Sequence, residues 1–190
     1  MSNAIEIEAK VLLSKDDYQK LVKHFPHAPR YVQTNHYIDS DDRVLLKDGI
    51  ALRIREKKGL YELTLKTPLS QGLLEKNVAI TIDDLVDLRD EDKFPQGDIA
   101  RFLTMLDIDI SQLKILTSMT TERIDIQYEG GLLSLDRSTY SGQTDYEVEF
   151  EFNNMNDAER ILKNLLDELE IPCQFSRVSK IHRAMAAIGK

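Results

Sequence analysis

The stretch Glu6-Ile7-Glu8-Ala9-Lys10 is the most informative part of this 190-residue chain. Successive side chains of a β-strand point to opposite faces, so a strand here places two carboxylates and an ammonium group on one face. The other face is wholly apolar and consists of Ile5, Ile7, Ala9 and Val11. A single strand of this kind usually has its charged face in water. It indicates a functional site only if other strands repeat the pattern.

Two later stretches do repeat it. Leu52-Arg53-Ile54-Arg55 places two guanidinium groups opposite aliphatic side chains, and Tyr146-Glu147-Val148-Glu149-Phe150-Glu151-Phe152 places three carboxylates opposite valine and aromatic side chains. The alternation is compatible with an open sheet whose charged face is in water, and equally with a closed barrel whose charges line a wet interior. The mixture of signs favours the barrel, because facing strands could then pair or jointly hold a metal ion and an anion.

Composition indicates one globular domain over residues 1–190, with 42% hydrophobic and 31% charged residues and no linker-like segment. The net charge of −8 argues against nucleic acid and anionic membranes as partners, because both select basic faces. No apolar run approaches the roughly 20 residues that cross a bilayer, and the N-terminus lacks a signal-peptide pattern. We therefore expect a cytoplasmic protein, which the lone Cys173 also fits.

Periodicity and turn residues predict helices interleaved with strands. The expected helices cover about 15–25, 83–92, 97–106, 156–170 and 178–188. The expected later strands cover about 31–39, 50–56, 60–67, 73–82, 113–118, 120–129, 131–139 and 144–152. Ser14-Lys15-Asp16-Asp17 and Asn156-Asp157-Ala158-Glu159 are candidate capping boxes at the start of two of the helices.

A protein with a net negative charge can bind an anion only through a local group of cationic side chains. The candidates are Arg53, Arg55, Lys66, Arg123, Lys180 and Arg183. Carboxylates beside these cations and a polyanion also suggest a divalent metal ion as mediator.

Taken in chain order, these residues resemble the CYTH superfamily, also called the triphosphate tunnel metalloenzymes. Glu6-Ile7-Glu8-Ala9-Lys10 matches the ExExK signature of that superfamily. The remaining matching positions are Arg53, Arg55, Lys66, Glu75, Arg123, Asp136, Glu147, Glu149, Lys180 and Arg183. The resemblance spans nearly the whole chain and is closest to the small single-domain bacterial members.

The resemblance implies an α+β fold, a closed eight-stranded antiparallel β-barrel that forms a tunnel, with polar side chains inside and helices packed outside. It also implies a triphosphate-bearing small molecule as substrate and Mg²⁺ or Mn²⁺ as cofactor. Activities in the superfamily include hydrolysis of inorganic triphosphate, thiamine triphosphate and nucleoside triphosphates, and adenylate cyclisation.

Roles for individual residues follow from this resemblance and from the chemistry of their side chains. Phosphate oxygens are expected to bind the guanidinium groups of Arg53 and Arg55, which can form bidentate contacts. The other expected substrate-binding residues are Lys66, Arg123, Lys180 and Arg183. The expected metal ligands are Glu6, Glu8, Glu147, Glu149 and Asp136, because Mg²⁺ and Mn²⁺ prefer oxygen ligands. The expected catalytic residues are Lys10, Glu75 and Glu8, with Lys10 neutralising charge on the transferred group and Glu75 orienting water.

The residues leave several alternatives open. Arg53 and Arg55 could pair with Glu56 or Glu62 on a surface, and Asp136 could be a turn residue. A metal-dependent triphosphatase acting on inorganic triphosphate is the first hypothesis, because the chain has no Trp and few aromatics for a nucleobase pocket. Thiamine triphosphatase, adenylate cyclase and a non-catalytic sensor of polyphosphate or nucleotide are the alternatives. The sequence leaves open whether the protein is a monomer or a homodimer.

Overall fold

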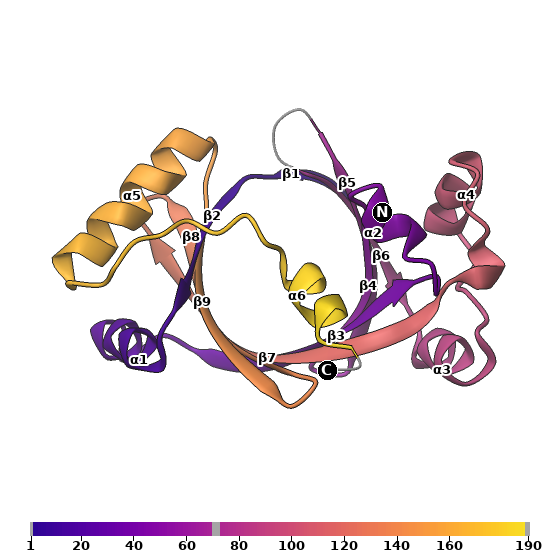
Figure 1. Ribbon diagram of the computed structural model, residues 1–190, viewed down its shortest axis with the longest axis horizontal. Helices are drawn as coiled ribbons and strands as arrows, with labels where there is room; N and C mark the ends of the chain where they lie inside the picture. The colour runs from indigo at the N-terminus through magenta and orange to yellow at the C-terminus, as the bar shows by residue number, and fades with distance from the viewer. Residues whose placement is uncertain (1, 70–72, 189–190) are drawn as a thin grey trace. The chain divides into compact units, whose positions relative to one another are not determined.

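The computed structural model describes residues 2–69 and 73–188, with side chains described from Ile7 onward. These residues form two compact units, whose helices and strands are labelled in Figure 1. Of the described residues, the first unit comprises 2–5, 33–69, 73–119 and 180–188, and the second comprises Glu6–Val32 and Thr120–Ser179.

The first unit contains a sheet with the strand order β1-β6-β5-β4-β3. The strands are β1 (Ser2–Glu6), β3 (Arg30–Asp39), β4 (Ala51–Lys57), β5 (Leu60–Pro68) and β6 (Leu73–Ile80). Neighbours from β3 to β6 pair antiparallel. The helices of this unit are α2 (Val44–Lys47), α3 (Ile82–Glu91), α4 (Asp98–Met105), the 3-10 turn η1 (Ile110–Gln112) and α6 (Lys180–Ala186).

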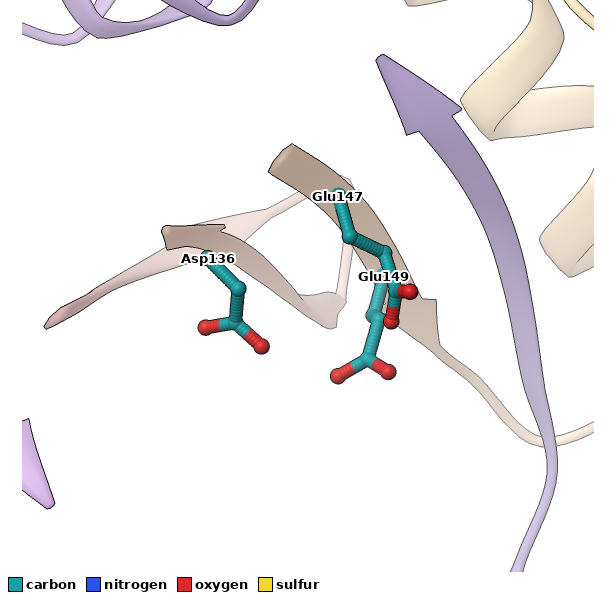
Figure 2. A group of neighbouring side chains, drawn as sticks. All are labelled: Asp136, Glu147 and Glu149. Atoms are coloured by element: carbon teal, nitrogen blue, oxygen red, sulfur yellow. The ribbon is translucent and has the colours of Figure 1, made fainter. Parts of the chain in front are cut away.

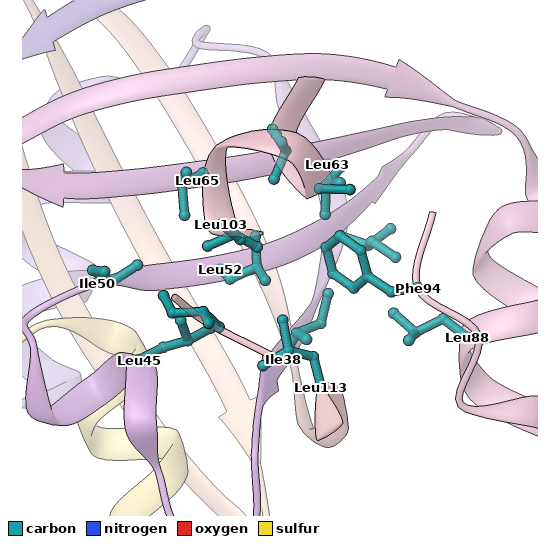
Figure 3. Packing of buried hydrophobic residues seen from close by; sticks show 14 of the residues in the cluster. Ile38, Leu45, Ile50, Leu52, Leu63, Leu65, Leu88, Phe94, Leu103 and Leu113 are labelled. Atoms are coloured by element: carbon teal, nitrogen blue, oxygen red, sulfur yellow. The ribbon is translucent and has the colours of Figure 1, made fainter. Parts of the chain in front are cut away.

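The core of the first unit lies between the apolar face of its sheet and its helices. Leu52 on β4 and Leu65 on β5 are fully buried there with Leu88 of α3 and Leu103 of α4 (Figure 3). Burial of each such side chain stabilises the fold by about 1.5–3 kcal/mol. Because strand side chains alternate, this packing turns Arg53 and Arg55 of β4 and Lys66 of β5 to the opposite face.

The second unit has the strand order β7-β8-β9-β2, all antiparallel. Its strands are β2 (Glu8–Leu13), β8 (Gly131–Tyr140), β9 (Gln143–Glu151) and the part of β7 (Lys114–Tyr128) from Thr120 onward. The helices α1 (Lys15–His24) and α5 (Met155–Glu168) cover its apolar face, where Leu21, Leu162 and Leu166 pack with Val148 and Phe150. Both units thus show the predicted division between a charged strand face and a helix-covered apolar face.

Three of the differences from the predicted element boundaries concern the first strand, β7 and α5. The first strand is interrupted at Ile7, because β1 neighbours β6 whereas β2 pairs with β9. The predicted strands 113–118 and 120–129 are one strand, β7, in which Met119 is fully buried. No proline or glycine lies between them to end the first one.

The third difference concerns the start of α5. Its N-cap is Asn154, whose side-chain oxygen accepts a hydrogen bond from the backbone N–H of Asp157 at 2.9 Å. The predicted capping residue Asn156 already lies inside the helix. The other predicted cap is confirmed, since the Ser14 hydroxyl accepts from the backbone N–H of Asp17 at 3.1 Å.

The short helix α2 was not predicted. Its backbone N–H groups at Leu45 and Leu46 donate to the two carboxylate oxygens of the buried Asp39, each at 3.0 Å. Asp39 therefore anchors the beginning of α2, since a carboxylate satisfies the free N–H groups of a helix N-terminus. Among the described residues, no helix combines the length and apolar character that crossing a membrane would require.

Candidate functional site

Three carboxylates converge on the charged face of the second unit. Asp136 of β8 lies opposite Glu147 of β9 in the strand register, and Glu149 follows two residues later on the same face. One oxygen from each of the three lies within 4.8 Å of the others (Figure 2). Their exposed fractions are 0%, 1% and 8%, so the alternative that Asp136 is a turn residue is wrong.

Arg123 of β7 binds two members of this carboxylate cluster. It faces Asp136 in the register and forms a bidentate pair with it, with N–O distances of 2.7 Å from Nε and 2.6 Å from Nη2. Nη2 also donates to Glu149 Oε2 at 2.8 Å. Burial acts to lower the pKa of Arg123, but Asp136 and Glu149 outweigh it and raise the pKa well above its ordinary value. The guanidinium group is therefore charged.

Lys10 adds a second cation to the cluster. It lies opposite Glu149 in the register of β2 and β9, and its Nζ is 3.7 Å from Glu149 Oε1. Its ammonium group also forms an ion pair with Glu8 on the same strand face. The four carboxylates named so far therefore exceed the two cations.

A bound divalent cation would balance this excess of negative charge. Carboxylate oxygens are the ligands that Mg²⁺ and Mn²⁺ prefer, and the oxygens of Asp136, Glu147 and Glu149 are close enough together to share one ion. A buried group of like charges is costly unless cations neutralise it. The structure thus brings together Asp136, Glu147 and Glu149 of the predicted metal ligands. Glu8 is not part of this group and pairs with Lys10, and the side chain of Glu6 lies outside the described residues.

A fifth acid on this face, Asp125 of β7, was missed in the sequence. Its carboxylate accepts hydrogen bonds from the Tyr31 hydroxyl at 2.6 Å and the Ser134 hydroxyl at 2.7 Å. It lies two residues after Arg123 and contributes to the raised pKa of that residue. The spacing of Asp125 from Arg123 was the only available signal, because the two hydroxyl partners come from other strands.

The first unit carries its own set of charged residues. Arg53 and Arg55, two apart on β4, share a strand face as predicted. Arg55 Nε donates to the Asn35 carboxamide oxygen of β3 at 3.0 Å. Arg53 Nε is buried and has no hydrogen-bond partner within the described chain, which fits a role in binding a ligand.

Lys66 and Glu75 form an ion pair on that same face. They lie opposite each other on β5 and β6, and Lys66 Nζ is 3.1 Å from Glu75 Oε2. Burial acts to raise the pKa of Glu75, but Lys66, the Asn77 hydrogen bond and Arg53 together lower it. Glu75 is therefore ionised at neutral pH.

The last two predicted cations lie on α6. Lys180 and Arg183 are three residues apart and partly buried, while Ile181, Ala184 and Met185 are buried. The helix begins at Lys180 and is shorter than the predicted range of 178–188. Both residues belong to the first unit, together with Arg53, Arg55, Lys66 and Glu75.

Comparison with known proteins gives the family. A model of the CYTH domain matches residues 4–185. The chain belongs to the CYTH family. The resemblance seen in the sequence motifs is thereby confirmed.

Individual relatives agree with this assignment. The chain is 35% identical over 175 residues to the "Putative triphosphatase YjbK" of Bacillus subtilis (strain 168), which covers 90% of both proteins. A crystal structure from Bacillus halodurans, described as a "putative adenylate cyclase", is 38% identical with a TM-score of 0.89, covering 96% of this chain and 98% of that one.

A more distant structure shares the fold. The "putative adenylyl cyclase HpAC1" of Hippeastrum is 24% identical, with a TM-score of 0.79 and 96% of each chain covered. The α+β fold class predicted from the sequence is confirmed by these likenesses and by the antiparallel strands and covering helices of both units.

Proposed function

We propose that this CYTH protein is a metal-dependent triphosphatase that hydrolyses the terminal phosphoanhydride of a triphosphate, with inorganic triphosphate as the preferred substrate. The observation that carries the proposal is the buried cluster of Asp136, Glu147 and Glu149, held together by Arg123 and Lys10. The name of the Bacillus subtilis relative, a "Putative triphosphatase", supports the reaction class.

The acidic residues of the second unit would hold the metal ion. Glu6, Glu8, Asp136, Glu147 and Glu149 are the proposed ligands. When bound, Mg²⁺ or Mn²⁺ would neutralise phosphate charge and polarise the P–O bond that breaks. The buried position of the three clustered acids keeps their oxygens in a fixed arrangement, which favours binding because little ordering remains to be done.

The cations would bind the triphosphate. Transfer of a terminal phosphoryl group depends mainly on positioning and on neutralising charge, so a set of fixed cations suits it. Arg53 and Arg55 would bind phosphate oxygens. The Nε–H of Arg53 has no hydrogen-bond partner within the described chain and would donate to one of these oxygens. The remaining proposed substrate-binding residues are Lys66, Arg123, Lys180 and Arg183.

Three residues are proposed to act on the reacting groups. Lys10 would neutralise charge on the transferred phosphoryl group, and Glu75, which is ionised, would accept a hydrogen bond from the attacking water and orient it. Glu8 would hold the Lys10 ammonium group through their ion pair.

One experiment separates triphosphatase activity from its alternatives. Purified protein is incubated with Mg²⁺ or Mn²⁺ and, in parallel, with inorganic triphosphate, thiamine triphosphate, ATP or GTP. Release of orthophosphate, fastest from inorganic triphosphate, is the expected result. Orthophosphate released fastest from thiamine triphosphate would change the assigned substrate.

Release of pyrophosphate with a cyclic nucleotide would instead show a cyclase, the second candidate, which the name of the Bacillus halodurans protein favours. Tight binding without turnover of any compound would show a non-catalytic sensor.

Variants test the assigned residues. Lys10→Ala and Glu149→Ala should each lose about 10²–10³-fold in kcat, because Lys10 would neutralise charge on the transferred phosphoryl group and Glu149 would hold the metal ion. Lys23→Ala and Glu91→Ala remove exposed charges of the same kind and should keep wild-type rates. Circular dichroism checks that all four variants fold. Full activity in a folded Lys10→Ala or Glu149→Ala variant would contradict the assigned roles.

A further inference from the structure

A chain of hydrogen bonds on the charged face of the first unit ends at Glu75. The Thr64 hydroxyl donates to the Asn77 carboxamide oxygen at 2.7 Å, and the Asn77 amide nitrogen donates to Glu75 Oε1 at 2.7 Å. The other oxygen, Glu75 Oε2, faces Lys66 Nζ at 3.1 Å. Each carboxylate oxygen of Glu75 therefore has its own donor, which fixes the plane of the carboxylate.

The strand register builds this chain. Thr64 lies directly opposite Asn77, and Lys66 lies directly opposite Glu75, in the pairing of β5 with β6. Thr64 is fully buried, so its hydroxyl is shielded from competing water. Strand pairing thus sets Lys66 against Glu75, whereas Asn77 lies two residues from Glu75 on the same face of β6 and is paired with Thr64.

The chemistry of the groups gives the chain one direction. An ionised carboxylate only accepts hydrogen bonds, so Asn77 must turn its NH₂ group toward Glu75. The carboxamide oxygen of Asn77 then faces Thr64, whose hydroxyl must donate. Thr64 therefore stabilises the single orientation of Asn77 that can hold Glu75.

We propose that Asn77, locked by Thr64, is a positioning residue that holds the Glu75 carboxylate in one orientation toward Lys66. The catalytic consequence rests on the proposed function, in which Glu75 orients water. The Asn77 hydrogen bond, Lys66 and Arg53 overcome the effect of burial and lower the pKa of Glu75, in agreement with this geometry. Asn77 itself acts only through Glu75.

A pair of Thr64 variants tests the lock. Thr64→Val keeps the shape of the side chain and removes the hydroxyl, whereas Thr64→Ser keeps the hydroxyl and removes a methyl group. We expect Thr64→Val to shift the titration of the Glu75 carboxyl carbon, followed by ¹³C NMR, to higher pH, and Thr64→Ser to leave it near the wild-type curve. A role in packing alone would leave the titration of Glu75 unmoved in both variants.

A matched control comes from the second unit. Thr121 is also a fully buried strand threonine whose hydroxyl forms one hydrogen bond, to Ser138 at 2.9 Å. Thr121→Val should therefore leave the titration of Glu75 unchanged. An unchanged curve in Thr64→Val, or a Thr64→Ser curve that matches Thr64→Val, would overturn the proposal.

Asn77→Leu removes the positioning amide directly. We expect the same upward shift of the Glu75 titration and a fall of about 10- to 100-fold in kcat with little change in KM, because misplaced groups slow the chemical step more than they weaken binding. If the NMR curves shift as expected and no protein hydrolyses triphosphate, the positioning role is supported and the proposed function fails. A fall in kcat with an unmoved Glu75 titration would overturn the positioning role.

Discussion

Three charged side chains of this protein are held by neutral ones. Arg55 is held by Asn35, Glu75 by Asn77, and Asp125 by Tyr31 and Ser134. Charged residues in alternation can be recognised along a chain, whereas their neutral partners come from neighbouring strands and follow no local pattern. The charged residues of the strands therefore lie on the faces that the alternation predicted, whereas their hydrogen-bonding partners could not be predicted from the sequence.

The lowered pKa of Glu75 predicts a pH-dependent contribution to stability. Because the pKa is lower in the folded protein than its ordinary value of 4.5, the ionised carboxylate stabilises the fold above that pH, and this contribution is lost as the pH falls through the folded-state pKa. Glu75→Gln should be less stable than the wild type by about 1.5–3 kcal/mol at pH 7. The difference should shrink below pH 4.5, as measured by urea unfolding.

Glu91→Gln, on an exposed position of α3, serves as the control and should show no pH-dependent difference. An equal loss of stability for Glu75→Gln at neutral and acidic pH would contradict the lowered pKa.

Two tyrosines differ in how their hydroxyls are satisfied. The Tyr18 hydroxyl is buried without a hydrogen-bond partner in the described part of the chain, and burial with the nearby Glu122 raises its pKa to about 12. Tyr18→Phe should therefore increase the free energy of unfolding by about 1 kcal/mol, which raises Tm by about 2–4 °C in a protein of this size. Tyr31→Phe loses a hydrogen bond to Asp125 and should lower the free energy of unfolding by about 1.5–3 kcal/mol. Thermal unfolding of both variants checks this, and a fall in Tm for Tyr18→Phe would show that its hydroxyl is satisfied in solution.

Helices and strands were predicted well where their ends carry local signals. The hairpin between β4 and β5 turns at Lys58 and Gly59, both at positive φ, as the Lys58-Gly59 pair indicated. The helix α2 could not be predicted in this way, because its anchor Asp39 belongs to the preceding strand. The interruption at Ile7 likewise follows from pairing with two different strands, β6 and β9, which no local pattern records.

The start of α5 offers a direct comparison between two asparagines. Asn154→Ala removes the capping hydrogen bond to the backbone N–H of Asp157 and should cost about 1 kcal/mol of stability. Asn156→Ala replaces an exposed residue inside the helix and should cost nothing or slightly stabilise it, because alanine has the higher helix propensity. Chemical denaturation measures both variants. The reverse order of stability would place the cap at Asn156.

The family model spans residues of both compact units. The first unit contains the cations Arg53, Arg55 and Lys66 with Glu75, and the second unit contains the buried acids with Arg123 and Lys10. This distribution predicts that metal binding is a property of the second unit's carboxylates and can be measured without turnover.

Metal ions should therefore stabilise the folded protein. Mn²⁺ or Mg²⁺ at about 100 times its Kd should add about 2.7 kcal/mol to the free energy of unfolding, because the ion binds the folded cluster and not the unfolded chain. Thermal unfolding with and without metal should show a rise in Tm that chelation with EDTA reverses. In Glu147→Gln, the rise in Tm that metal causes, measured against a metal-free sample of the same variant, should be smaller than in the wild type.

Asp16→Asn is the matched control, since it removes one exposed negative charge and should keep the full metal-induced rise. An equal rise in the wild type and in Glu147→Gln would place the metal away from the carboxylate cluster.

The amino-acid sequence alone determined the alternation of charged and apolar faces, most helices and strands, and the residues that match the CYTH motifs, because these depend on spacing along the chain. The tertiary structure decided which groups meet: Arg123 with Asp136 and Glu149, Lys66 with Glu75, and Asn77 between Thr64 and Glu75. These contacts depend on the register between strands, which is set by backbone pairing and by burial of the apolar face, and a shift of one residue would turn every charged side chain to the other side.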